Sequence, residues 1–323
     1  MSLLEVKNLK TSFKTLRGMV TAIDGVSFNI DKDEMVAIIG ESGCGKSVTS
    51  QSIMRLYPET DKSVEYEGEV LFNGEDILHI PFKEMAKHRG NDIAMIFQDA
   101  LAALNPVFTV GDQIIEALRI HKKITKKEAR KEAIKLLEQT GIPDAAKRVD
   151  AYPHELSGGM RQRAMIALAL SCRPQILIAD EPTTALDVTI QAQIMEMIVN
   201  LNKEYGMGII LITHDLGVVA QHCKRAMVMY LGQIVEEGDV ETMFKHPMHP
   251  YTKGLIKSVP TTKTDKDKPL YTINGVVPKL SEAGDSCRFC DRCEHATERC
   301  FHECPALKTA GEEGHNVRCF LYE

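Results

Sequence analysis

The sequence predicts an α/β fold whose sheet is largely parallel, with a helical subdomain, an antiparallel β portion and a small cysteine-rich C-terminal extension. Short apolar runs of strand length alternate with segments of helical spacing, which is the pattern of strands that lie between helices. The middle third of the chain shows helical spacing alone. The extension is marked by its cysteines, because six of the nine fall between Cys287 and Cys319.

The composition is that of a globular protein, with 44% hydrophobic and 26% charged residues. The net charge of −6 and the pI of about 6.0 offer no basic surface for nucleic acid. No apolar run approaches the roughly 18 residues of a membrane span, and the N-terminus lacks the basic and apolar regions of a signal peptide. We therefore expect a protein of the cytoplasm that reaches a membrane only through a partner.

One stretch organises the chain: Gly40–Ser47, which reads G-x-x-x-x-G-K-S. The apolar run 35–39 leads into it as a strand and 46–56 follows as a helix, which is the context that a phosphate-binding loop needs. Glycines let backbone N–H groups approach a phosphate, and a helix N-terminus favours an anion. The pattern predicts that Lys46 reaches the β- and γ-phosphates and that Ser47 ligates Mg²⁺. The alternative is a glycine-rich turn that matches by chance.

The other elements follow in order along the chain. Strands are predicted at residues 3–9, 26–30, 67–72, 93–97, 176–179, 208–213, 226–230 and 233–236. Helices are predicted at residues 110–120, 126–139, 157–171 and 189–205. We interpret these as a nucleotide-binding domain over 1–245 with a helical subdomain at about 99–174, a linker over 246–284, and the extension over 285–323.

Two acidic residues close the apolar run 176–179. Asp180 stands where ATPases with such a loop place a carboxylate linked to Mg²⁺, and Glu181 follows it directly. A carboxylate beside the terminal phosphate can orient the attacking water. The alternative, two surface acids at a strand end, is disfavoured by the loop upstream.

A second glycine-rich stretch, Leu156-Ser157-Gly158-Gly159-Met160, opens a helix and forms a second anion site. Here the sequence resembles the ATP-binding subunits of ABC transporters, whose signature is LSGGQ. Met160 departs from the signature, where the family usually has Gln. We expect this change to be tolerated because the side chain is not among the expected phosphate contacts.

The resemblance covers nearly the whole chain and implies an ABC-type P-loop ATPase core that binds ATP and Mg²⁺. Gln98 matches the glutamine that couples Mg²⁺ and water to the membrane subunits, and His214 matches the histidine that contacts the γ-phosphate. Ala185-Leu186-Asp187 matches the loop that crosses the dimer interface, and Phe13 is placed like the aromatic residue that stacks on adenine. The implied catalytic residues are Glu181, His214 and Gln98. The implied nucleotide-binding residues are Phe13, Gly40, Ser42, Gly43, Cys44, Gly45, Lys46, Ser47, Val48, Asp180, Ser157 and Gly159, with Ser47 and Gln98 also on Mg²⁺.

Further features are similar to the dipeptide, oligopeptide and nickel uptake group of this family. They are Gln98-Asp99 followed by Leu104-Asn105-Pro106, the stretch His249-Pro250-Tyr251-Thr252, and the cysteine tail. The chain looks most like the D-type ATPase subunit of dipeptide importers. The resemblance implies a peripheral protein of the cytoplasmic membrane face that works with a second ATPase subunit or a second copy of itself. It also implies two permease subunits and an external solute-binding protein, and no nucleic acid.

The tail reads Cys287-x2-Cys290-x2-Cys293-x6-Cys300-x3-Cys304-x14-Cys319. Clustered thiols in a reducing compartment indicate a metal site, and four thiolates suit an iron–sulfur cluster or zinc. The resemblance implies Cys287, Cys293, Cys300 and Cys319 as ligands of a [4Fe–4S] cluster, with Zn²⁺ as the alternative. A rival ligand set is Cys287, Cys290, Cys293 and Cys304, because Cys304-Pro305 is similar to the ferredoxin run. We expect the tail to fold only with its metal and the ATPase core not to depend on it.

Other functions stay open at this point. One is the ATPase of a related importer for nickel or another small solute. Another is a soluble, non-transport ABC protein of DNA repair or of ribosomes. Repair members usually carry long coiled-coil insertions and ribosomal members two cassettes in one chain, whereas this chain has one cassette and no long heptad run. A tail that senses redox state and regulates the ATPase is compatible with the importer.

Overall fold

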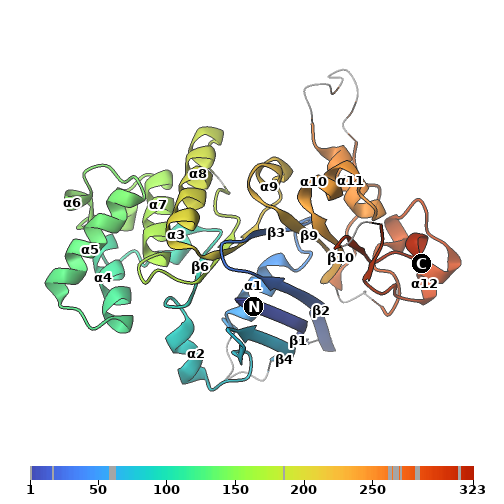
Figure 1. The fold of residues 1–323 in the computed structure, drawn as a ribbon, viewed down its shortest axis with the longest axis horizontal. Coiled ribbons are helices and arrows are strands. Elements are labelled where there is room, and N and C mark those ends of the chain that lie inside the picture. The colour runs from blue at the N-terminus through green and yellow to red at the C-terminus, as the bar shows by residue number, and fades with distance from the viewer. Residues whose placement is uncertain are drawn as a thin grey trace. The chain divides into compact units, whose positions relative to one another are not determined.

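The computed structural model describes residues 2–16, 18–57, 63–184, 186–260, 264, 269, 271–280, 284–311 and 314–323 (Figure 1). The chain forms two compact units. Unit 1 comprises residues 1–4, 30–34 and 79–212, and unit 2 comprises residues 5–29, 35–78 and 213–323. The chain therefore passes from one unit to the other several times, and residues far apart in the sequence meet within each unit.

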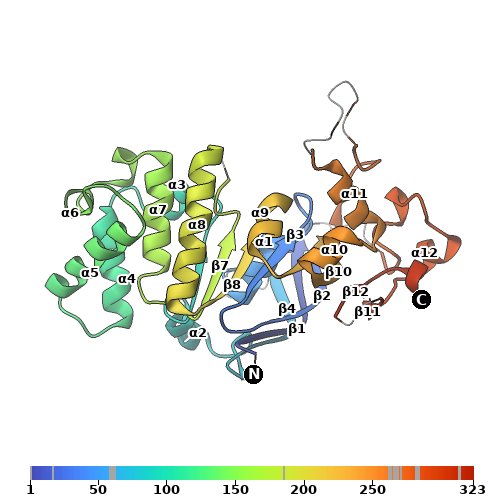
Figure 2. The same ribbon diagram turned by 45° about the horizontal axis from the view of Figure 1, so that its top comes forward.

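Unit 1 contains parallel strands, one of which ends at the predicted acidic pair Asp180-Glu181. β6 (Ile93–Ile96) pairs with β7 (Ile176–Asp180), and β7 pairs with β8 (Gly208–Ile212). Every residue of these strands is buried, and such continuous apolar runs are typical of parallel strands. Helices α7 (Gly158–Ala169) and α8 (Val188–Tyr205) lie side by side next to the strands (Figure 2).

Helices α4 (Val110–His121), α5 (Lys126–Gln139) and α6 (Ala145–Arg148) of unit 1 surround an apolar cluster of their own, which α7 shares. At the start of α5, the Thr125 side chain accepts a hydrogen bond from the Glu128 amide, and the Glu128 carboxylate accepts one from the Thr125 amide. This reciprocal cap explains why the helix begins where its sequence predicts. Unit 1 also contains the short helices α2 (Phe82–His88) and α3 (Ala100–Ala103) and the 3₁₀ turn Pro153–Glu155.

One sheet, which lies largely in unit 2, has the strand order β2-β1-β4-β5. β4 and β5 are antiparallel and meet at the turn Asn73-Gly74, where both residues have positive φ angles. Its strands are β1 (Leu4–Thr15), β2 (Gly18–Ile30), β4 (Val64–Phe72) and β5 (Glu75–Asp76).

The strand that leads into the glycine-rich loop, β3 (Met35–Ile39), is parallel to β9 (Arg225–Tyr230). β9 forms an antiparallel hairpin with β10 (Gln233–Asp239). Two short strands of the tail continue this sheet, because β12 (Asn316–Val317) pairs with β10 and β11 (Lys308–Thr309) pairs with β12. The helices of unit 2 in this region are α1 (Lys46–Ile53), α9 (Leu216–His222), α10 (Val240–Lys245) and α11 (Pro250–Ser258).

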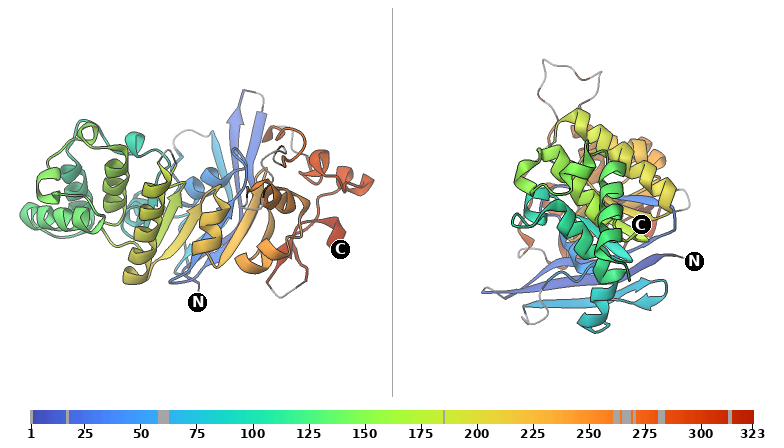
Figure 3. Two further views of the ribbon diagram at one scale, coloured as in Figure 1. Left: turned by 90° about the horizontal axis from the view of Figure 1, so that it is seen from above. Right: turned by 90° about the vertical axis from the view of Figure 1, so that its left-hand side faces the viewer.

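The cysteine-rich tail packs into unit 2 through three buried aromatic rings. The ring centroid of Tyr230, at the end of β9, lies 4.7 Å from that of Tyr251 in α11 and 5.2 Å from that of Phe289 in the tail. In Figure 3 the tail lies beside the hairpin and the helices that follow it. The tail therefore shares buried packing with the preceding strands and helices of unit 2, and the expectation that the core does not depend on the tail stays a prediction. The tail's own short elements are the 3₁₀ turns Cys290–Arg292 and Phe320–Tyr322 and the helix α12 (Glu298–His302).

The first part of the predicted linker over 246–284 contains a helix in the structure. It includes α11, which His249 caps by accepting a hydrogen bond from the Tyr251 amide, and Tyr251 is fully buried. The prediction failed because two prolines around His249 masked a helix of nine residues. Most of the stretch 261–268 lies outside the described residues. The domain bounds at 245 and 285 stay a prediction.

The predicted strands and helices before residue 245 are present, with differences at their ends. β1 and β2 run several residues further than predicted, and α1 ends at Ile53. The short helices α2, α9 and α10 were not predicted, because about two turns carry too few apolar positions to show a period. None of the helices in the described part of the chain has the length and hydropathy needed to cross a membrane.

Candidate functional site

The glycine-rich loop has the backbone of a phosphate cradle. Gly43 and Gly45 have φ angles of 80° and 108°, which other residues rarely adopt. A Cβ atom on Gly40 would lie 2.3 Å from the carbonyl oxygen of Met229 in β9, so only glycine fits there. The loop runs directly into α1, whose first turn therefore presents backbone N–H groups to an anion.

The lysine of this loop is buried and held by the loop itself. Lys46 is 5% exposed, and its Nζ donates to the carbonyl oxygens of Gly40 at 2.8 Å and Glu41 at 3.0 Å. Cys44 is also buried, and burial raises the pKa of its thiol. Ser42 and Gly43 are exposed and Ser47 and Val48 half-buried, so the tip of the loop is open while its base is fixed.

Unit 1 brings two predicted catalytic residues together. The Gln98 amide donates to the Glu181 carboxylate at 2.9 Å, and Thr184 Oγ1 donates to the same oxygen at 2.9 Å. Glu181 has a φ angle of 46°, which a non-glycine residue rarely adopts and which is often found at functional sites. Its backbone amide donates a hydrogen bond to the carbonyl oxygen of Ile212, at the end of β8. The carboxylate is thus aimed by contacts on its side chain and on its backbone.

Three further predicted residues, Asp180, His214 and Phe13, lie within or just after strands. Asp180 is the last residue of β7 and is 3% exposed. His214 is exposed in unit 2, immediately before Asp215, which caps α9. Phe13 is half-buried in β1, and its ring packs edge-on against Tyr57 at 4.9 Å.

The second glycine-rich stretch lies at the start of α7. Ser157 is exposed, and its hydroxyl caps the helix by accepting a hydrogen bond from the Met160 amide at 3.4 Å. A cavity of about 400 Å³ in unit 1 is lined by residues of this stretch, of the segment after β6 and of the loop after Glu181, including Gly158, Gln98 and Thr184. Gly159 is half-buried beside Ile190. Ala185 of the predicted interface loop lies outside the described residues.

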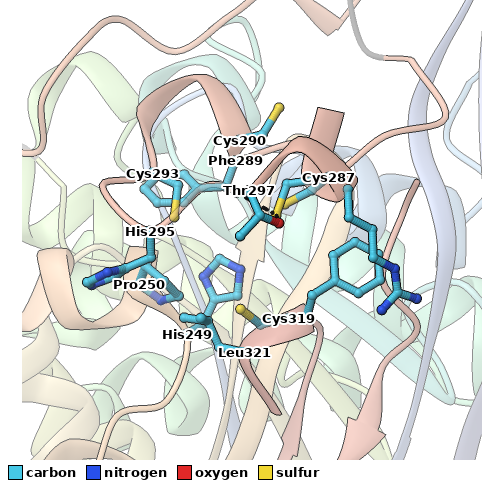
Figure 4. Close-up of a pocket in the computed structure, with 13 residues that line it drawn as sticks. His249, Pro250, Cys287, Phe289, Cys290, Cys293, His295, Thr297, Cys319 and Leu321 are labelled. Atoms are coloured by element: carbon cyan, nitrogen blue, oxygen red, sulfur yellow. Dashed lines mark hydrogen bonds between the residues drawn. The ribbon is translucent and has the colours of Figure 1, made fainter. Parts of the chain in front are cut away.

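Most of the tail cysteines line one cavity of about 190 Å³ in unit 2 (Figure 4). Burial, together with the nearby thiols of Cys300, Cys290 and Cys319, raises the pKa of Cys287 to about 12. Figure 4 shows the sulfurs of Cys293 and Cys319 directed inward and that of Cys290 directed away. The cysteines that line the cavity are Cys287, Cys290, Cys293, Cys300 and Cys319.

The described part of the tail does not show the expected metal site with its ligands already grouped. Within the described residues, no group of three or more His, Cys, Asp or Glu side chains is placed so that it could hold a metal ion. Five of the six tail cysteines line the cavity, but their side chains do not form such a group. Cys304 is exposed and lies outside the cavity lining, so the rival ligand set that includes it is not brought together.

The comparisons with known proteins agree with the loop, the signature stretch and the tail. The sequence pattern described as "ABC transporter" matches residues 23–184. The pattern described as "Oligopeptide/dipeptide transporter, C-terminal region" matches residues 235–300. The chain belongs to the ATP-binding subunits of the ABC transporter family.

Relatives from this ABC family extend over the full chain. The oligopeptide transport ATP-binding protein AppD of Bacillus subtilis is 48% identical, and the match covers 100% of this chain and 97% of that protein. The dipeptide transport ATP-binding protein DppD of the same organism is 51% identical over 99% of this chain and 95% of its own length.

Solved structures support the ABC fold. The dimeric post-hydrolysis structure of the ATP-binding cassette MJ0796 with ADP and Pi is 30% identical, with a TM-score of 0.66. It covers 73% of this chain and 98% of its own. The structure of cbiO1 from Clostridium perfringens, part of the cbiONQ transporter complex, has a TM-score of 0.62 at 29% identity over 76% of this chain and 91% of its own. The predicted P-loop ABC ATPase fold is therefore confirmed.

Sequence reasoning missed the residues that attach the tail of this ABC subunit. Glu236 in β10 is fully buried and accepts hydrogen bonds from the amides of Met248 and His249, each at 2.8 Å. His315 of the tail lies 2.8 Å from the same carboxylate through Nε2. Arg292 of the tail pairs with Glu41 of the glycine-rich loop. Charged residues such as these are unusual because they are buried. A single sequence does not show burial, so it gave no signal that these residues hold the tail.

Proposed function

We propose that this chain is the ATP-hydrolysing subunit of a peptide importer at the cytoplasmic face of a membrane. The observation that carries the proposal is the match with relatives named as oligopeptide and dipeptide transport ATP-binding proteins, at 48% and 51% identity over essentially the whole chain. The match extends through the C-terminal region, which carries the oligopeptide/dipeptide transporter pattern. The Gly40–Ser47 loop geometry supports ATP binding independently.

The residues of the chain divide the work as follows. The glycine-rich loop and Lys46 would bind the phosphates, and Ser47 and Gln98 would bind Mg²⁺. Glu181 orients the attacking water, for which the fixed geometry of its carboxylate is suited. His214 contacts the γ-phosphate and Phe13 stacks on adenine. Ser157 and Gly159 serve the nucleotide of a second ATPase subunit, because Ser157 is exposed at a helix N-terminus.

The partners follow from this division. Two ATPase subunits, either copies of this chain or this chain with a related one, close on ATP and separate after hydrolysis. Their closure drives two permease subunits, which receive cargo from an external solute-binding protein. The alternatives, an importer of nickel or a soluble ABC protein, are not favoured by any of the comparisons.

The test is reconstitution with the two permease subunits and the binding protein of a peptide importer. Proteoliposomes with ATP inside and the binding protein outside should take up a labelled dipeptide, and Lys46→Ala should abolish uptake. Equilibrium titration of the isolated chain with ATP tests nucleotide binding separately. Uptake of Ni²⁺ without any peptide uptake would show that the cargo is a metal ion and not a peptide. A chain that does not bind ATP would overturn the proposal.

A second proposal concerns the tail: Cys287, Cys293, Cys300 and Cys319 hold a [4Fe–4S] cluster that cross-links its segments. All four line the cavity of about 190 Å³. A single zinc ion would need its four sulfurs within about 4 Å of one another, since Zn–S bonds are about 2.3 Å long. The thiols line one cavity, and the described residues form no ready site for a single ion, so we take the larger cluster and keep zinc as the alternative. When bound, the cluster supplies metal–thiolate bonds that stabilise a segment with few apolar residues.

Anaerobic purification with iron, zinc and acid-labile sulfide analysis decides between these metals. Cys293→Ser should remove the cluster. Cys304→Ser is the matched control, because Cys304 lies outside the cavity lining and should leave the iron content unchanged. Stoichiometric zinc without sulfide would replace the cluster with zinc, and a chain without metal would overturn both.

A further inference from the structure

We propose that Arg292, in the cysteine-rich tail, is a positioning residue for the phosphate-binding loop and raises the affinity of the chain for ATP. The inference rests on the proposed ATP binding but assigns a role to a residue outside the nucleotide motifs. Arg292 lies in the turn between Cys290 and Cys293, and its partner Glu41 is the second residue of the Gly40–Ser47 loop. The two are 251 positions apart.

Glu41 is held from three directions within unit 2. Its carboxylate accepts two hydrogen bonds from Arg292, Nη1 to Oε2 at 2.7 Å and Nη2 to Oε1 at 3.2 Å. Its amide donates to the Tyr251 hydroxyl at 2.8 Å, and its carbonyl oxygen accepts from Lys46 Nζ at 3.0 Å. The conformation of this residue therefore fixes the first turn of the loop and the resting place of the phosphate-binding lysine.

Arg292 is itself a rigid anchor. Its side chain is 4% exposed, and its Nε donates to the carbonyl oxygen of Asn274 at 3.0 Å. Its guanidinium lies 5.8 Å from the ring centroid of Tyr230 and 5.9 Å from that of Phe289, which is within the range of cation–π attraction. A bidentate pair with such an anchor also defines orientation, because the planar fork matches a carboxylate. Glu41 is thus placed by the tail.

Charge gives the sign of the effect. Glu41 puts a carboxylate in a loop that binds a polyanion, and two negative charges in a partly buried site repel each other. Arg292 neutralises that carboxylate. Without Arg292, the loop would lose one of its three constraints and would present an unpaired negative charge to the nucleotide. ATP affinity should therefore fall, and added salt should reduce the loss because it screens the repulsion.

The tail offers a matched control in Arg288. Its side chain is 7% exposed, and it pairs with Asp24 in β2, Nη2 to Oδ2 at 2.5 Å. It also donates to the carbonyl oxygen of Leu231 in the β9–β10 turn. Like Arg292 it ties the tail to unit 2 by a buried ion pair, but none of its described hydrogen bonds reaches the loop. A role in docking the tail alone would make the two arginines equivalent.

The experiment is an equilibrium titration of the full chain with ATP and Mg²⁺, by calorimetry, at two salt concentrations. Arg292→Gln should weaken binding roughly fivefold or more, the lower end of usual couplings between sites. Arg288→Gln should change it less than about twofold even though it lowers the unfolding temperature similarly. Arg292→Lys keeps the charge and should recover part of the affinity, which provides a milder variant if Arg292→Gln folds poorly.

The decisive variant is Glu41→Gln in the Arg292→Gln background. It removes the unpaired carboxylate and should restore most of the lost affinity, which a purely structural role for Arg292 would not produce. Equal losses in the Arg292 and Arg288 variants, or no restoration by Glu41→Gln, would overturn the inference while leaving the proposed function intact. Failure of the wild-type chain to bind ATP would overturn the proposed function itself.

Discussion

The glycine-rich loop and the cysteine-rich tail are both dense in unusual residues, but they differ in where their structural information lies. The loop is specified by consecutive residues, Gly40–Ser47, and its geometry follows from φ angles and close approaches that glycine alone permits. The tail is specified by pairings with residues far away in the sequence, such as Arg292 with Glu41 and His315 with Glu236. A local motif can be identified from sequence with its function, whereas the sequence of such a tail does not show which distant residues it contacts.

The largest expected effect concerns the motif side of this comparison. Glu181→Gln should keep ATP binding and lower hydrolysis by a factor of roughly 10² to 10⁴, the usual contribution of a positioned acid or base. The amide keeps the shape of the side chain but cannot accept a proton from water. Phosphate release by the assembled transporter measures this. Glu196→Gln, an exposed residue of α8 in the same unit, is the control and should be silent.

A turnover close to that of the wild type in Glu181→Gln would show that the motif does not carry the chemistry assigned to it. The unusual φ angle of Glu181 and its contacts with Gln98 and Thr184 would then need another explanation.

The second prediction tests whether the tail is held by its contacts with residues that are distant in the sequence. Glu236→Ala should lower the free energy of unfolding by about 2 to 5 kcal/mol, because it leaves the buried amides of Met248 and His249 without an acceptor. Glu241→Ala, on the neighbouring helix α10, removes a carboxylate from a side chain that is 76% exposed and should cost less than about 0.5 kcal/mol. Urea unfolding of both variants gives the comparison.

If the two glutamate variants unfold at the same urea concentration, the tail is not held by its buried carboxylate. The tail would then be the detachable extension that the sequence predicts.

The same contrast explains how far the sequence was informative. The apolar runs predicted β7 and β8 because parallel strands are buried throughout, and helical spacing predicted α5. The contact between Gln98 and Glu181 joins residues 83 positions apart, and only the resemblance to the ABC family placed both at one site. Nothing in the sequence marks Tyr251 as a partner of the loop, since a tyrosine after a proline has no pattern of its own. Motifs carry local geometry, and packing between segments carries the rest.

The third prediction concerns assembly and is smaller. The isolated chain should hydrolyse ATP slowly, because the nucleotide site is proposed to need the signature stretch of a second subunit. Addition of the second ATPase subunit and the permeases should raise the rate about tenfold or more, as expected when a missing anion-stabilising group is supplied. Light scattering alongside phosphate release provides the check. Full activity from a strictly monomeric preparation would contradict the two-subunit site.

The prediction with the smallest effect on function is a difference in thiol reactivity, which separates the tail cysteines from one another and from the buried Cys223 after α9. Alkylation requires the thiolate, and burial raises the pKa of Cys223 to about 12, so its thiol should be mostly protonated at pH 8. Exposed Cys304 should react first with iodoacetamide, and Cys223 last. Cys287, Cys293, Cys300 and Cys319 should stay protected until the cluster is stripped by acid, after which the loosened tail should expose all four. Peptide mass spectrometry before and after stripping reads out each site. Rapid alkylation of any of the four in the anaerobically purified chain would remove that cysteine from the ligand set, and protection of Cys304 in their place would favour the rival set.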